Sequence, residues 1–145
     1  MSNGRTDGRK IWVVGDDALT LPSGVERAAG IDEADVAVAV GESALLNLAR
    51  EGCSTPILPV DAGAGVRAID AAAVGSALDS VRAGEVTQTE IPILAVDVDG
   101  ERRGRALMDV MLVTTEAAHI SEFAVETPRK EVAEFRADGV VVATA

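Results

Sequence analysis

The chain has 145 residues, with 24 acidic residues against 13 Lys and Arg, so its formal net charge is −11. This length fits one ordinary domain or two small units, and 48% hydrophobic residues provide enough apolar side chains for a packed core, which argues against general disorder. Duplex nucleic acid and anionic membranes attract basic surfaces, and single-stranded nucleic acid requires several aromatic residues. A pI of about 4.4 and 2% aromatic residues therefore exclude these partners.

Lysine occurs only at Lys10 and Lys130, and the other cations are arginines. Abundant acids and scarce lysine are typical of a halophilic protein, in which high salt screens the self-repulsion, although an ordinary acidic protein has a similar composition. Cys53 and His119 are the single residues of their types, so we expect no disulfide and no metal site. Residues 1–9 are polar and no run reaches about 18 apolar residues, which predicts a cytoplasmic protein without a signal peptide or membrane span.

Residues 9–84 alternate short apolar runs with segments of helical periodicity, after a leader at 1–8 that we expect to be disordered. The apolar runs predict buried strands at 10–15 (KIWVVG), 35–41 (DVAVAVG) and 56–60 (PILPV). Because the run at 35–41 has no polar face, both of its faces should be covered, as in a parallel sheet between helices.

Helix signals lie between and after these runs. A helix is expected at 43–50, with Ser43 as its N-cap and Gly52 beyond its end, and another at 70–83, closed by Gly84. Residues 18–31 are less well determined, and Ser23 could cap a short helix there. Residues 9–84 therefore read as an α/β unit.

From residue 85 onward the periodicity changes to alternation, which predicts an antiparallel, β-rich unit over 85–145. Asp99-Gly100 is a strong two-residue hairpin signal. The expected strands are an extended segment at 85–99, its hairpin partner at 105–115, and further strands at 119–126, 132–137 and 139–145. The fold class is thus a small parallel α/β unit followed by a β-rich unit.

The last strand, GVVVATA, runs to the end of the sequence with no turn or polar tail after it. A hydrophobic edge of this kind pairs readily with other chains. We therefore expect either a truncated gene product or a partner that covers the edge, and self-association of the chain into a homo-oligomer.

Two turns follow buried strands, at residues 40–44 (VGESA) and 61–65 (DAGAG). In open parallel sheets, ligands bind beyond the carboxyl ends of strands, and helix N-termini attract anions such as phosphate. The alternative is that Glu42 and Ser43 merely cap a helix and that residues 61–65 only connect two elements. Neither turn has the spacing of a P-loop or of GxGxxG, so spacing alone leaves both readings open.

Residues 106–110 (ALMDV) and 135–144 (FRADGVVVAT) resemble the NAD kinase family, in which a strand reading A-L-N-E/D-V precedes a segment like F-R-A-D-G-V-V-V-A-T. Residues 56–66 look like the family's P-I-L-G-I-N-x-G-x-L-G-F, and residues 36–46 occupy the place of its strand followed by G-G-D-G-T. The resemblance implies a truncated NAD kinase-like fold, because the family's G-S-T-A-Y segment would begin after Thr144.

The resemblance implies that the chain transfers the terminal phosphoryl group of ATP, or of polyphosphate, to the 2′-hydroxyl of NAD with Mg²⁺. It places Glu42 at the position of the catalytic base. It assigns cofactor-binding roles to eight further residues: Gly41, Ser43, Asp61, Gly63, Gly65, Asp109, Asp138 and Gly139. The chain departs from the family where Glu42 replaces Asp, where Met108 replaces the Asn before the acidic residue, and where Ser43 and Ala44 replace Gly and Thr.

Three hypotheses follow: an NAD kinase-type enzyme, a non-catalytic relative that binds a nucleotide or a partner chain, and an inactive fragment of a longer kinase. Formation of NADP from NAD and ATP separates the first from the other two.

Overall fold

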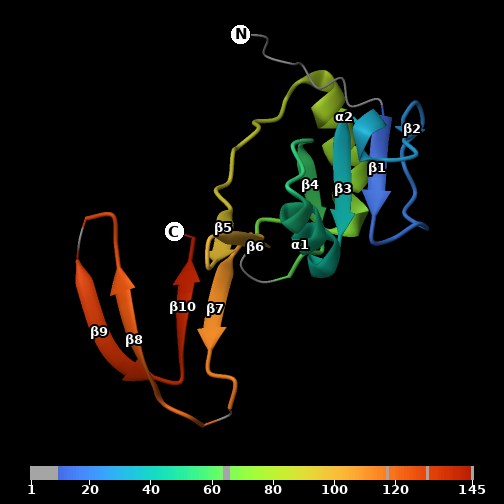
Figure 1. The fold of residues 1–145 in the computed structure, drawn as a ribbon. Helices are drawn as coiled ribbons and strands as arrows, with labels where there is room; N and C mark the ends of the chain where they lie inside the picture. The colour runs from blue at the N-terminus through green and yellow to red at the C-terminus, as the bar shows by residue number, and fades with distance from the viewer. Residues whose placement is uncertain (1–9, 64–65, 117, 130, 145) are drawn as a thin grey trace. The chain divides into compact units, whose positions relative to one another are not determined.

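The computed structural model describes residues 10–63, 66–116, 118–129 and 131–144 (Figure 1). They belong to two units that divide between Ile91 and Pro92. The leader predicted at 1–8 lies outside the described residues. Within the described part of the chain, the helices are too short or too polar to cross a membrane.

A four-stranded parallel sheet organises the first unit. In the order of the sheet, its strands are β2 (Glu26–Arg27), β1 (Lys10–Val14), β3 (Val36–Val40) and β4 (Ile57–Val60). In β3, Val36, Ala37, Val38 and Ala39 are at most 4% exposed, because the strand is central and both of its faces are covered. The buried parallel strands predicted from the apolar runs are therefore confirmed.

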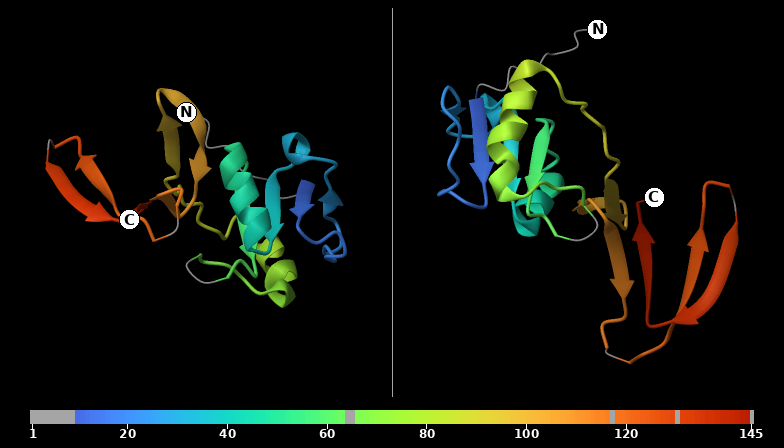
Figure 2. Two further views of the ribbon diagram at one scale, coloured as in Figure 1. Left: turned by 60° about the horizontal axis from the view of Figure 1, so that its bottom comes forward. Right: turned by 180° about the vertical axis from the view of Figure 1, so that it is seen from behind.

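Two helices cover the two faces of this sheet, α1 (Glu42–Glu51) and α2 (Val74–Ala83), and the views in Figure 2 place them on opposite sides. Val74 and Leu78 of α2 pack into a core with valines and isoleucine of the sheet: Ile11, Val13, Val36, Val38 and Val60. On the other side, α1 buries small and leucine side chains: Ala44, Leu45, Leu48 and Ala49. Both helices end at a glycine in the left-handed conformation, Gly52 and Gly84, as predicted.

The first unit corrects two local predictions. Helix α1 begins at Glu42 with Gly41 as its N-cap, so Ser43 lies inside the first turn and is not the cap. Over 18–31 the chain forms β2 and a 3-10 turn at Ile31–Glu33 instead of a helix capped by Ser23. Two arginines bind backbone carbonyls of this segment. Arg27 donates to the carbonyl of Leu19, and Arg82 donates to that of Ser23.

The second unit consists, within the described residues, of two-stranded antiparallel ladders. The pairs are β5 (Leu94–Val98) with β6 (Glu101–Ala106), β7 (Asp109–Val113) with β10 (Gly139–Ala143), and β8 (Ser121–Glu126) with β9 (Val132–Ala137). The hairpin predicted at Asp99-Gly100 is confirmed. Both residues have positive φ, 53° and 81°, as a tight hairpin turn requires.

The partner strand of that hairpin was predicted wrongly at 105–115. The two-residue turn places Glu101 directly opposite Val98, so β6 begins at Glu101, and the segment Asp109–Val113 is a separate strand that pairs with β10. His119 lies in the turn before β8 and not in a strand. Its Nδ1 lies 2.6 Å from Oε2 of Glu116.

Truncating a core leucine of α2 is expected to test the packing of the first unit. Leu78 is 0% exposed, so Leu78→Ala should lower the free energy of unfolding by about 2–5 kcal/mol, through lost burial and the cavity left behind. Denaturant titration at fixed salt measures the change. The control is Val86→Ala, whose side chain is 50% exposed and whose effect should stay within about 0.5 kcal/mol. Equal effects of the two substitutions would contradict the packing described here.

Candidate functional site

Three turns follow the carboxyl ends of β1, β3 and β4 and lie at the same edge of the parallel sheet. They begin at Gly15, Gly41 and Asp61. In the sheet, β1 and β3 are neighbours, whereas the strands that follow them, β2 and β4, lie on opposite sides. Such a reversal of strand order marks the point where open parallel sheets bind ligands.

The first turn packs tightly against the second. Gly15 has a φ of 96°, and a Cβ placed on it would lie 2.1 Å from the carbonyl oxygen of Val40 and 2.9 Å from the Cβ of Ala44. Only glycine fits there, because both the backbone angle and the space exclude a side chain. Sequence reasoning did not assign Gly15 a role in the site, since a close approach between distant segments leaves no local pattern.

The second and third turns bring predicted site residues together. The amide of Gly41 donates to the carbonyl of Val60 at 2.8 Å, which ties the end of β4 to the start of α1. Oε2 of Glu42 lies 3.7 Å from the position that a Cβ would take on Gly63. Glu42 and Gly63, which the sequence assigned to one site, are therefore neighbours.

The remaining predicted residues of this edge are placed as follows. Ser43 is exposed in the first turn of α1, and Asp61 is exposed with a φ of 47°. Gly65 lies outside the described residues. No described side chain caps the N-terminus of α1, so its first amides are open to an anion.

This edge fits a magnesium-bound phosphate better than a metal ion held by protein alone. Among the described residues, no group of three or more potential metal ligands is close enough to hold an ion. Mg²⁺ in phosphoryl-transfer sites is bound by one or two carboxylates together with phosphate oxygens and water. Asp61, exposed at the end of β4, provides one such carboxylate at this edge.

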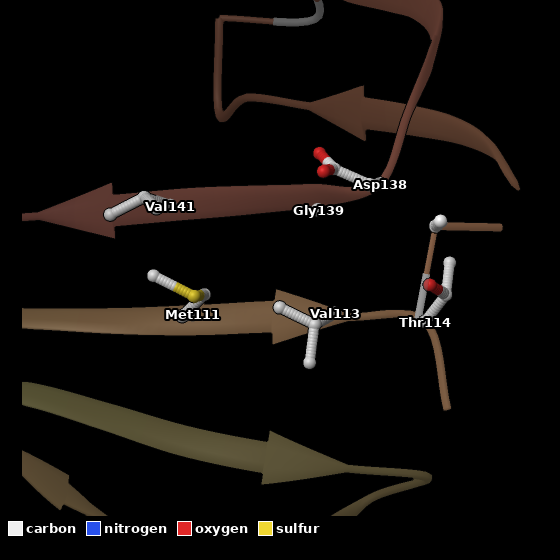
Figure 3. Close-up of a pocket in the computed structure, with 7 residues that line it drawn as sticks. Met111, Val113, Thr114, Asp138, Gly139 and Val141 are labelled. Carbon is white, nitrogen blue, oxygen red and sulfur yellow. The ribbon is translucent and has the colours of Figure 1, made fainter. Parts of the chain in front are cut away.

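The second unit has a hollow on one face of the β7–β10 ladder (Figure 3), with a volume of about 430 Å³. Asp138 lies at its end, immediately before β10, and its carbonyl accepts a hydrogen bond from the amide of Thr114 at 3.2 Å. Apolar side chains from the paired strands form its floor. The lining residues are Met111, Val113, Thr114, Ala118, Asp138, Gly139 and Val141.

Asp109 lies at the far end of the same ladder, opposite Ala143. Alternation along β7 places Asp109 on the face that carries Met111 and Val113. Asp138 adjoins Thr114, five positions from Asp109, so the two carboxylates are about 16 Å apart along the strands. They can contact different parts of an extended ligand, but not a single sugar.

The β5–β6 hairpin carries an ion pair across its ladder. Arg102 is paired with Asp97 across the ladder, and this hydrogen bond, together with the charge of Asp97, raises the pKa of Arg102 above its ordinary value. Arg102 therefore stays cationic at every physiological pH, and its charge is matched by a specific partner.

Comparison of the chain with protein-family models, with curated proteins and with solved structures finds no match.

Proposed function

We propose that the chain is an NAD kinase-like protein with a truncated form of that fold. It would transfer the terminal phosphoryl group of ATP, or of polyphosphate, to the 2′-hydroxyl of NAD with Mg²⁺ and yield NADP in the cytoplasm. The observation that carries the proposal is the carboxylate of Glu42 beside Gly63, at the ligand-binding edge of a parallel sheet. The sequence resemblance assigns Glu42 to the position of the base and Gly63 to cofactor binding.

In this proposal, Glu42 accepts the proton of the attacking hydroxyl as the new O–P bond forms and the bond to the leaving phosphate of the donor breaks. A ribose hydroxyl is a weak nucleophile, so a carboxylate within hydrogen-bonding reach accelerates the attack. The open amides of α1, beginning at Glu42 and Ser43, bind phosphate oxygens. When bound, Mg²⁺ neutralises charge on the transferring phosphoryl group.

Within the second unit, the hollow is proposed as a binding region for a nucleotide. Its volume of about 430 Å³ is in the range of small-molecule sites, and its apolar floor suits the flat face of a base. The carboxylate of Asp138 would accept hydrogen bonds from ribose hydroxyls. Gly139 follows it, where a Cβ would lie 2.9 Å from the carbonyl oxygen of Leu112. Asp109, about 16 Å along the ladder, would contact another part of the dinucleotide.

A second candidate is a non-catalytic relative that binds NAD without turnover. The observations that favour it are Met108, which cannot replace the hydrogen bonds of an Asn amide, and Glu42, which is one methylene longer than Asp. Misplacement of a base by about 1 Å can lower the rate about 100-fold.

Formation of NADP from NAD, ATP and Mg²⁺ at high salt tests the proposal. Turnover supports the kinase. Measurable NAD affinity without turnover supports the non-catalytic relative, and the absence of both would overturn the two candidates together.

The Asp138 contact has its own test. Asp138→Asn should weaken NAD binding about 10-fold or more, since hydrogen bonds to a charged group contribute about 1.5–3 kcal/mol. Calorimetric titration with NAD at fixed salt measures the change. Asp32→Asn, in the 3-10 turn of the first unit, makes the same change in charge and should leave the affinity unchanged. Equal losses in both variants would show that only net charge matters.

A further inference from the structure

The β7–β10 ladder exposes apolar side chains on both of its faces. Met111, Val113 and Val141 are 63%, 56% and 55% exposed on the face of the hollow, and Leu112 and Val142 are 61% and 53% exposed on the other. A two-stranded ladder is marginally stable by itself in water. Further paired strands would stabilise such a ladder.

Hydrogen bonds at the two ends of the ladder show which backbone groups of β10 point away from β7. The amide of Thr144 donates to the carbonyl of Met108, and the amide of Thr114 donates to the carbonyl of Asp138. Even-numbered residues of this strand therefore bond to β7. In an antiparallel pair the bonding alternates, so Gly139, Val141 and Ala143 direct their N–H and C=O groups outward. Within the described residues, this outer edge of β10 has no partner strand.

The other two ladders carry features that protect an edge from pairing, and β10 carries none. The β5–β6 ladder has a register shift at Val96/Asp97 and charged residues along β6. Charged side chains also recur in β8 and β9: Glu122, Glu126, Glu134 and Arg136. Bulges and charges of this kind block pairing between edges, whereas β10 reads Gly-Val-Val-Val-Ala without a charge or proline.

We propose that β10 pairs with β10 of a second copy of this chain, antiparallel and about a two-fold axis at Val141. The five-residue strand is centred on Val141, so the outward-pointing residues match one another: Val141 opposes Val141, and Gly139 opposes Ala143 of the second copy. Each such pair exchanges two hydrogen bonds, about six in total. The result is a four-stranded sheet that joins the two β7–β10 ladders and satisfies the exposed edge with an isologous interface.

Charge makes this association dependent on salt. Each copy has a formal net charge of −11, but the paired strands themselves are neutral. The nearest like charges across the interface are Asp109 of one copy and Asp138 of the other, about 10 Å apart when strands are spaced about 4.8 Å. The Debye length is about 10 Å at 0.1 M salt and about 3 Å at 1 M, so high salt removes this repulsion. The dimer should therefore form at molar salt and dissociate at low salt.

The molar mass of the chain in solution, measured by sedimentation or light scattering over a salt series, tests the proposal. The unmodified chain is expected to be a dimer at molar salt, and Val141→Pro a monomer, because proline removes an outward N–H without removing a bond to β7. The matched control is Val132→Pro in β9. The amide of Thr127 bonds to the carbonyl of Glu131, so Val132 also points its N–H outward, and this variant should stay dimeric. A monomeric unmodified chain at molar salt, or equal losses in both variants, would overturn the proposal.

Cross-linking tests the register even if Val141→Pro disturbs folding. In a Cys53→Ser background, Val141→Cys should give a disulfide-linked dimer on oxidation, because paired Cα atoms about 5.5 Å apart match disulfide geometry. Val140→Cys should cross-link far more slowly, since its symmetry mate lies about 8 Å away by the same strand spacing. Equal cross-linking at both positions would rule out the axis at Val141.

Discussion

Replacing Glu42 by Gln is expected to lower the rate of NADP formation at least about 100-fold without changing the affinity for NAD. The amide is nearly the same size as the carboxylate but cannot accept a proton, and general bases contribute about 10²–10⁴-fold to such reactions. Initial rates with saturating NAD, ATP and Mg²⁺ measure the loss, and calorimetric titration measures the affinity.

The control substitution is Glu51→Gln, at the other end of the same helix. It makes the same change in charge and in helix composition, and Glu51 is exposed, so the rate should stay within about twofold. Glu42→Asp keeps a carboxylate but moves it by one methylene, so it should lose less activity than Glu42→Gln. If Glu42→Gln turns over NAD as fast as the unmodified chain, Glu42 is not the base, even where the chain proves to be a kinase.

The parallel core of the first unit could be predicted from the sequence because its signals are local. A run such as VAVAV has no polar face, so it must be buried on both sides, and the structure places it at the centre of a parallel sheet. Gly52 and Gly84 end their helices in the left-handed conformation, which the sequence also indicates.

Strand pairing in the second unit could be predicted only where the turn is short. Asp99-Gly100 determines its own hairpin, because two residues of positive φ leave one register. The pairing of Asp109–Val113 with Gly139–Ala143 joins strands some thirty residues apart, and alternation alone does not say which strands meet. For the same reason, the sequence did not indicate that Asp109 and Asp138 lie about 16 Å apart, at opposite ends of one ladder.

The sequence was sufficient to predict that Glu42 and Gly63 lie close together at the sheet edge. It was not sufficient to predict that Gly15 packs against the turn after β3. Glu42 and Gly63 follow neighbouring parallel strands, so topology alone brings their turns together. Gly15 contributes no side chain, and its importance depends on a carbonyl that is distant in the sequence. Only the three-dimensional structure shows the contact between Gly15 and the carbonyl of Val40.

Gly15→Ala is accordingly expected to have a large effect on stability, lowering the free energy of unfolding by more than about 4 kcal/mol. A φ of 96° is unfavourable for alanine, and its methyl group would overlap the carbonyl oxygen of Val40 at 2.1 Å. That oxygen belongs to the backbone between β3 and α1, so the overlap is relieved only by moving the turn that positions Glu42. The same variant should therefore lose NADP formation at temperatures where it is still folded.

Gly75→Ala is the matched control for this prediction. Gly75 lies in α2, and a Cβ placed on it meets nothing within 4 Å, so alanine should stabilise the helix by about 0.5–1 kcal/mol. Denaturant titration of both variants at the same salt compares a glycine required by a close contact with one that is not. If Gly15→Ala is as stable as Gly75→Ala, the turn after β1 does not pack on the turn after β3, and the sheet edge lacks the rigid frame that positions Glu42. The hydrogen bond from Gly41 to Val60 joins only the turn after β3 to the end of β4, so it would not replace the contact made by Gly15.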